Sequence, residues 1–245
     1  MRRFFICPVC VILLGLTAAR PASAQQSLNL QIGVFVPTGS QSSNGTVISS
    51  RDVNDVLAGD IPFLDFTMKD FNGPTVNGEW LFGVGDKVEA GLGIGFYSRT
   101  VPSVYANVVN KNGTEIQQDL KLRVVPFTAT VRFLPLGQKA GIVPYVGAGI
   151  GVFAWRYQET GQFVDFSDNS IFSGTFTGSG TTIGPVVLGG VRVPIDNWGI
   201  GGEIRYQHAK GDLPTDQGFA GGTSAHGPTI DLGGFNFLFS INFRF

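Results

Sequence analysis

The stretch GGFNFLFSINFRF, residues 233–245, ends the chain and decides between fold classes. Apolar side chains occupy every second position from Phe235 to Phe245, and the positions between them are mostly Asn, Ser or Arg. A period of two is typical of a β-strand whose two faces differ in polarity. A soluble sheet would turn the apolar face toward its core, whereas a membrane sheet would turn it toward lipid. The rest of the chain must distinguish these two arrangements.

The first 24 residues have the pattern of a secretory signal peptide. Two arginines precede an apolar run, which ends at the small residues Ala22, Ser23 and Ala24. We therefore expect cleavage after Ala24 and a mature domain of residues 25–245. Both cysteines, Cys7 and Cys10, lie in the predicted signal peptide. The mature chain would then have no disulfide, no thiolate metal ligand and no cysteine nucleophile.

Charge and hydropathy exclude two classes of protein. Three of the 17 basic residues lie in the predicted signal peptide, which leaves 14 basic against 18 acidic residues, a net charge of −4. This weak negative charge is not typical of nucleic-acid binding, so no nucleic-acid partner is expected. After the signal peptide, no apolar run approaches the roughly 18–20 residues of a transmembrane helix.

The alternation of the last strand recurs along the mature chain. Seven further stretches follow it, and we expect each to be a strand: residues 28–36, 76–84, 88–97, 122–133, 143–158, 184–193 and 198–207. The glycine-rich runs GLGIG and GAGIG lie inside two of these strands. They therefore lack the strand-to-helix turn of a dinucleotide-binding loop.

The connections between the predicted strands alternate in length. Those near Asp86, Gln138 and Asp196 are short and rich in turn residues. The long, polar ones cover residues 38–73, 100–118, 158–174 and 210–228. Eight strands with all short connections at one end predict an all-β fold, an eight-stranded antiparallel up-and-down transmembrane β-barrel with apolar side chains outside. A soluble lipocalin-type barrel, with its apolar face inside, is the alternative.

The polar faces of the strands predict a charged lumen. Three glutamates and three arginines would form an ion-pair network there: Glu79, Glu89, Arg132, Arg192, Glu203 and Arg205. Arg156 and Arg244 also fall on the faces expected to point inward. Because side chains fill the interior of an eight-stranded barrel, we interpret this network as structural. A gated or narrow solute path is the alternative. The inward glycines 91, 93 and 95 would either make room for long side chains or permit curvature of the strand.

Aromatic residues near the strand ends predict interface girdles. They are Trp80, Trp155, Tyr157, Trp198 and Tyr206.

The chain resembles the small outer-membrane β-barrel proteins of Gram-negative bacteria, among them the OmpA transmembrane domain, OmpX and OmpW-type families. The resemblance rests on the signal peptide, the eight alternating strands, the run PYVGAGIGVFAW at residues 144–155 and the strand that ends at Phe245. It implies a location in the bacterial outer membrane. It also implies that Ile241, Phe243 and Phe245 are a signal read by the outer-membrane assembly machinery.

The resemblance also implies partners and a range of functions. The partners would be outer-membrane lipids, the barrel-assembly machinery and periplasmic chaperones, with no cofactor and no metal. The preferred function is a structural and surface-interaction barrel with a filled lumen and long extracellular loops. The alternatives are a narrow channel for small or hydrophobic solutes, like OmpW-type porins, and an outer-membrane lipid- or peptide-hydrolysing enzyme.

The last loop and the first loop bear on these alternatives. His208 and His226 lie near Asp212, Asp216 and Ser224, but no catalytic spacing is recognisable, so we expect no enzyme activity. The first loop, within residues 38–73, contains the apolar run IPFLDF in a polar context. We expect it to fold over the barrel mouth or to bind a surface ligand, because long loops on rigid scaffolds often carry function. A disordered, variable surface loop is the alternative.

Overall fold

The computed structural model describes residues 25–38, 64–165, 167–214, 219 and 229–245. The strands are β1 (Gln26–Pro37), β2 (Leu64–Asp65), β3 (Gly73–Gly83), β4 (Val88–Val109), β5 (Glu115–Phe133), β6 (Val143–Asp165), β7 (Ser170–Ile195), β8 (Trp198–Gln207), β9 (Lys210–Asp212), β10 (Thr229–Asp231) and β11 (Gly234–Arg244). A short 3₁₀ helix covers Met68–Phe71. Among the described residues, no helix is long and apolar enough to cross a membrane.

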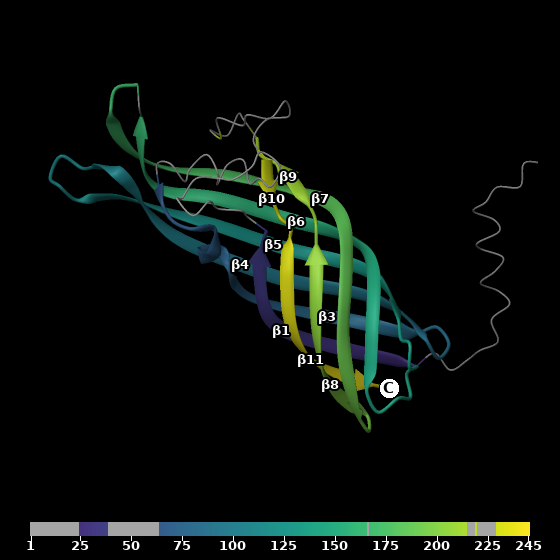
Figure 1. The fold of residues 1–245 in the computed structure, drawn as a ribbon. Coiled ribbons are helices and arrows are strands. Elements are labelled where there is room, and N and C mark those ends of the chain that lie inside the picture. The colour runs from purple at the N-terminus through teal and green to yellow at the C-terminus, as the bar shows by residue number, and fades with distance from the viewer. Residues whose placement is uncertain (1–24, 39–63, 166, 215–218, 220–228) are drawn as a thin grey trace, which may run out of the picture.

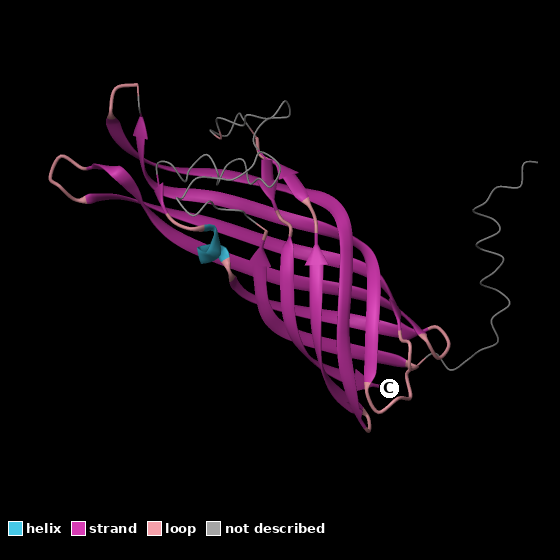
Figure 2. Cartoon of the chain, in the orientation of Figure 1, coloured by secondary structure: helices cyan, strands magenta, loops and turns pink. Residues whose placement is uncertain are grey.

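Eight of these strands close into a ring (Figures 1 and 2). The order is β1, β3, β4, β5, β6, β7, β8 and β11, and β11 pairs with β1 to complete the wall. Every neighbouring pair is antiparallel. The predicted eight-stranded antiparallel up-and-down barrel is therefore confirmed. The short connections lie at one end, which we call the turn end, and the opposite end is the loop end.

The outer face of the wall forms an apolar belt. Along β5 the outward positions from Val125 to Phe133 are all apolar, and this segment spans nine residues. A transmembrane strand needs about 9–11 residues. On the outer faces of β1 and β4, Ile32 is 62% exposed and Leu92 is 59% exposed. Apolar side chains outside and polar ones inside are the arrangement of a transmembrane barrel, so the soluble alternative is wrong.

Above the belt, β4 to β7 continue well beyond the other strands and form a projecting sheet (Figure 1). Two connections that the sequence predicts as long loops, residues 100–118 and 158–174, are thus mostly strand. The alternation continues there with its polarity reversed. In β5, Leu120 and Leu122 point inward and are buried, whereas Lys121 and Arg123 are exposed. A polar exterior is expected where a wall leaves the membrane and meets water.

The other two long connections are only partly described. Within the first, β2 pairs with β4, and the 3₁₀ helix follows it. Within the last, β9 and β10 form a small two-stranded sheet. Residues 39–63, 215–218 and 220–228 lie outside the described part, as does the predicted signal peptide, residues 1–24.

Candidate functional site in the barrel lumen

Three groups of buried side chains lie along the lumen. A small apolar cluster of Leu134, Val143, Tyr145 and Leu188 lies toward the turn end. Charged side chains form the middle layer, and a large apolar cluster lies at the loop end. The middle layer is the candidate site, because buried charges require a specific arrangement of partners.

Four of the predicted charged residues form one network at the centre. Arg132 of β5 donates from Nη2 to Glu79 of β3, and also to Glu203 of β8 at 2.8 Å. Arg205 of β8 donates from Nε to Glu203 Oε1 at 2.9 Å, and its Nη2 lies 3.5 Å from Glu79 Oε2. Each carboxylate therefore contacts both guanidinium groups, and the formal charges cancel.

Neutral groups complete the hydrogen bonding of the two carboxylates. The Tyr145 hydroxyl donates to Glu203 Oε2 at 3.0 Å, and the Thr130 hydroxyl donates to Glu79 Oε1 at 3.2 Å. The guanidinium carbon of Arg132 also lies 4.7 Å from the centre of the Tyr145 ring, within the range of a cation–π contact. Arg132 is only 1% exposed. The arrangement holds four charges inside the barrel with partners on several strands.

Glu89 and Arg192 form a separate pair. Arg192 of β7 donates from Nη2 to Glu89 Oε1 at 2.7 Å and from Nη1 to Glu89 Oε2 at 3.4 Å. Both side chains are buried. The structure thus places all six predicted lumen residues inside the barrel, but as a four-residue network and a bidentate pair.

Glycines on the inner face of β4 provide the space for this layer. A Cβ atom on Gly91 would lie 2.7 Å from Glu79 Oε1 and 2.7 Å from Thr130 Oγ1. These distances are too short for a Cβ atom, so a larger residue at position 91 would force the Glu79 carboxylate or the Thr130 hydroxyl to move.

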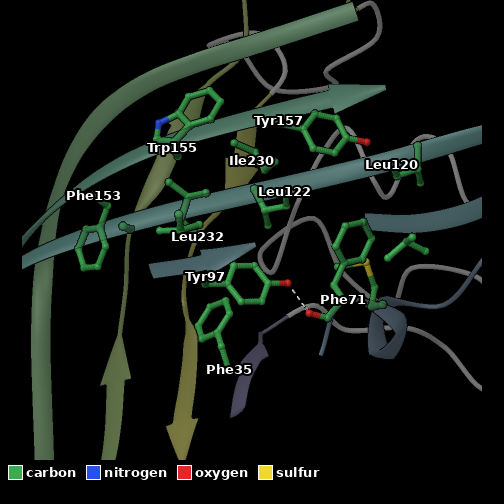
Figure 3. Packing of buried hydrophobic residues seen from close by; sticks show 14 of the residues in the cluster. Phe35, Phe71, Tyr97, Leu120, Leu122, Phe153, Trp155, Tyr157, Ile230 and Leu232 are labelled. Carbon is green, nitrogen blue, oxygen red and sulfur yellow. Dashed lines mark hydrogen bonds between the residues drawn. The ribbon is translucent and has the colours of Figure 1, made fainter. Parts of the chain in front are cut away.

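The large apolar cluster packs at the loop end of the barrel (Figure 3). It combines inward wall residues such as Phe153 and Leu122 with residues of the first loop and of the β9–β10 region. The Tyr97 hydroxyl donates to the backbone carbonyl of Phe71, as the dashed line in Figure 3 marks. Phe66 of the IPFLDF run is buried in the same cluster. The described end of the first loop therefore folds into the mouth of the barrel.

Two of the predicted girdle residues belong to this cluster instead. Trp155 is 5% exposed and Tyr157 is 0% exposed, and both lie on the inner face of β6 (Figure 3). The girdle prediction is wrong for both. The outward positions of β6 are the alternate ones, including Val146, Ile150 and Arg156. Arg156 was expected in the lumen, and it is exposed instead.

The other predicted girdle residues lie on the outer wall. Trp80 is 46% exposed, and its ring contacts those of Phe82 and Phe245 near the turn end. Trp198 pairs with Phe243 across β8 and β11, and Tyr206 packs against Phe235 nearer the loop end.

The three residues of the predicted assembly signal also face outward. Ile241, Phe243 and Phe245 are all exposed. The backbone N–H of Phe245 donates to the carbonyl of Gln26 at 3.0 Å, so this end of the chain lies at the seam between β11 and β1.

The remaining predictions concern catalysis and metals. His208 is exposed just after β8, whereas His226, Asp216 and Ser224 lie outside the described residues. No group of three or more His, Cys, Asp or Glu side chains that could hold a metal occurs in the described part of the chain. Tyr145 and Thr130 are the site residues that the sequence did not reveal. Tyr145 shares the inner face of β6 with Trp155, and both faces of β6 carry apolar residues, so the sequence pattern does not show which face points inward.

Comparisons with known proteins do not identify the chain. No protein-family model and no curated protein matches it. Neisserial surface protein A is similar in structure, with 11% identity, a TM-score of 0.43 and coverage of 90% of this chain and 97% of that one. The outer-membrane protein AlkL in lipid bilayers has 13% identity, a TM-score of 0.42 and coverage of 100% and 97%. The N-terminal β-barrel domain of Pseudomonas aeruginosa OprF has 12% identity, a TM-score of 0.37 and coverage of 91% and 99%. The strand pairing and the apolar belt, and not these likenesses, define the fold of this chain.

Proposed function

We propose that the chain is an integral protein of the bacterial outer membrane, in which a closed and filled barrel supports surface-exposed strands and loops. The observation that carries the proposal is the reversal of polarity along the wall. Outward side chains are apolar over one membrane thickness and polar beyond it, as in β5 below and above Val125. A closed ring also pairs the strand backbones without a free edge inside lipid.

The filled lumen supports a structural role rather than transport. The Arg132 network crosses the centre of the barrel and joins β3, β5 and β8. An apolar cluster lies on each side of it along the barrel. A hydrated ion would have to displace paired, buried charges, and breaking such a pair costs about 3–5 kcal/mol.

The projecting sheet supports a role in surface interaction. It extends β4 to β7 beyond the belt and places polar side chains in solvent. Loops and projecting strands on a rigid wall are favourable positions for recognition. In this proposal the outward residues Ile241, Phe243 and Phe245 are the signal for the assembly machinery, and no residue has a catalytic role.

Passage of small apolar solutes is the second candidate. A shallow, mostly apolar hollow of about 560 Å³ lies in the wall between β7, β8 and β11. Gly189 and Gly202 line it, and neither has a side chain to fill it. An apolar solute could rest there against the wall.

Single-channel recording of refolded residues 25–245 in a planar bilayer tests the main proposal. A heat-modifiable gel band first establishes that the barrel is folded. We expect no steady openings, because the charged layer and its two apolar neighbours fill the lumen. Steady openings from the folded barrel would contradict the filled lumen. Uptake of an apolar dye into vesicles that contain the non-conducting barrel would favour the second candidate.

A further inference from the structure

Three cations gather on the outer wall where β5 and β6 leave the apolar belt. Arg123 of β5 is the direct cross-strand partner of Arg156 of β6, and Lys121 lies two residues farther along β5. All three side chains are exposed. We call Lys121, Arg123 and Arg156 the basic patch.

The basic patch lies at the upper edge of the belt. The next outward residue below Arg123 is Val125, and the next below Arg156 is Ala154, followed by Val152. From Val125 the belt continues without a charged outward residue to Phe133. Since this length matches one membrane thickness, the patch lies at the depth of lipid headgroups. Long basic side chains commonly place their charge at this depth.

Among the described residues, no carboxylate forms an ion pair with Lys121, Arg123 or Arg156. Like charges directly opposite each other on neighbouring strands are destabilising. Within the part of the chain that the structure describes, ion pairs form only among lumen residues, and none includes a member of the patch. The nearest outward carboxylate on β5 is Asp119, which lies beyond Lys121 and farther from the membrane.

The neighbours in the same row are small hydroxyl residues. Ser98 of β4 pairs with Arg123, and Ser179 of β7 pairs with Arg156. Short side chains on both sides leave the two guanidinium groups accessible from the lipid side. Cross-strand neighbours are separated by about 5 Å, so two guanidinium groups can contact one phosphate together. The planar guanidinium group is suited to bidentate phosphate contacts.

We propose that the basic patch binds the phosphate headgroup of an anionic lipid in the membrane leaflet on the loop side of the barrel. This inference rests on the proposed membrane location and adds a specific lipid site to it. The lipid is the favoured occupant because the patch continues directly into the apolar belt. A headgroup phosphate and its acyl chains would contact the patch and the belt at the same time.

Native mass spectrometry of the refolded barrel tests this site. Residues 25–245 in neutral detergent are titrated with phosphatidic acid or with phosphatidylcholine of the same acyl chains. We expect the wild-type barrel to retain phosphatidic acid at least about tenfold better, since each basic residue near an anionic surface contributes measurably to binding. The Arg123→Gln/Arg156→Gln variant should lose about tenfold of this preference.

A matched variant controls for net charge. Lys111→Gln/Lys139→Gln removes two exposed charges at the tips of the molecule and should retain the wild-type preference. Equal phosphatidic acid binding by the arginine variant would overturn the site. So would displacement of the lipid by inorganic phosphate in large excess, because it would show a site for the free anion.

Insertion distinguishes this inference from the function on which it rests. The wild-type protein and both variants are mixed with phosphatidylcholine vesicles, and protease protection is measured. If the folded wild-type barrel does not insert, the membrane function itself is wrong. If it inserts and shows no preference for phosphatidic acid, only the lipid site is wrong.

Discussion

Trp155 and Arg156 are consecutive residues of β6 that face opposite sides of the barrel wall. The Trp155 indole packs inside the barrel with Phe153 and Tyr157, whereas the Arg156 guanidinium is exposed outside, beside Arg123. The wall at this height therefore separates an apolar interior from a polar exterior. Within the apolar belt the polarity is reversed, with apolar side chains outside the wall and polar ones inside.

Tryptophan fluorescence tests this reversal. The chain has three tryptophans, so variants that keep only Trp80, only Trp155 or only Trp198 can be made with phenylalanine at the other two positions. In vesicles of lipid with brominated acyl chains, Trp80 and Trp198 should be quenched because they are exposed on the belt. Trp155 should be quenched little, because the wall shields it. Equal quenching of all three tryptophans would mean that the orientation assigned to β6 is wrong.

Removal of Arg132 should destabilise the barrel strongly. Arg132→Met leaves Glu79 and Glu203 buried with a single guanidinium partner, and the expected loss in free energy of unfolding is about 3–5 kcal/mol. Urea unfolding in lipid vesicles measures this loss. Lys139→Met, at an exposed position in the β5–β6 turn, should change stability by no more than about 0.5 kcal/mol. Similar midpoints for the two variants would mean that the network is not buried.

The Glu89–Arg192 pair should behave as a separate unit. Arg192→Met and Glu89→Gln should each destabilise the barrel, and the double variant should cost less than the sum by about 0.5–3 kcal/mol. No such coupling is expected between Arg192→Met and Thr130→Val, because Thr130 bonds to the other network. A double-mutant cycle from unfolding midpoints measures both values. A large coupling in the second cycle would show that the two groups act as one.

Gly91 on the inner face of the wall and Gly78 on the outer face test how tightly the side chains in the lumen pack. Gly91→Ala places a methyl group against Glu79 and Thr130, so we expect a loss of about 1–3 kcal/mol from overpacking. Gly78 lies on the outer face, where a Cβ atom would have no neighbour within 4 Å. Gly78→Ala should be neutral or stabilise the strand by about 0.5–1 kcal/mol. The same unfolding assay compares them, and equal effects would contradict the assigned faces.

The hydroxyl of Tyr97 should hold the first loop in the barrel mouth. Tyr97→Phe leaves the Phe71 carbonyl without its donor, at a cost of about 1–3 kcal/mol if that carbonyl stays buried. Hydrogen–deuterium exchange of peptides that cover residues 64–72 should become faster, while exchange in β5 stays unchanged. Tyr206→Phe, on the outer wall, is the control and should leave the loop unaffected. Unchanged exchange in the Tyr97 variant would contradict this role of the hydroxyl.

The strand pattern in the sequence predicted the ring and most of the lumen. The six charged residues of the lumen each have apolar or glycine neighbours along their strand. Once the apolar face was taken as the outer one, the charged face was predicted to point inward. This inference failed in β6, where Tyr145, Phe153 and Trp155 share a face with glycines and the opposite face is also apolar. Two apolar faces leave the orientation of a strand undetermined. Only pairing with β5, whose faces differ in polarity, resolves it.

The projecting sheet could not be predicted for a related reason. Segments such as 115–121 are polar enough to suggest a loop, yet they alternate with residues that the sheet buries on its inner face. An alternating segment shows that its faces differ, but it does not show which solvent each face meets. The outward residues change from charged to apolar between Arg123 and Val125, but the alternation continues through both segments, so the period alone does not mark the height at which the medium changes.

The pairing of β1 with β11 has a consequence for the order of events during folding. This seam joins Ser27 to Arg244, whereas every other neighbouring pair in the ring joins strands that lie closer together in the chain. Closing a longer loop costs more entropy, and distant pairings form late. Until the last strand arrives, β1 and β8 would each expose an unpaired edge. The barrel is therefore vulnerable to mispairing and proteolysis up to the final step, and a helper that shields those two edges would act at that moment.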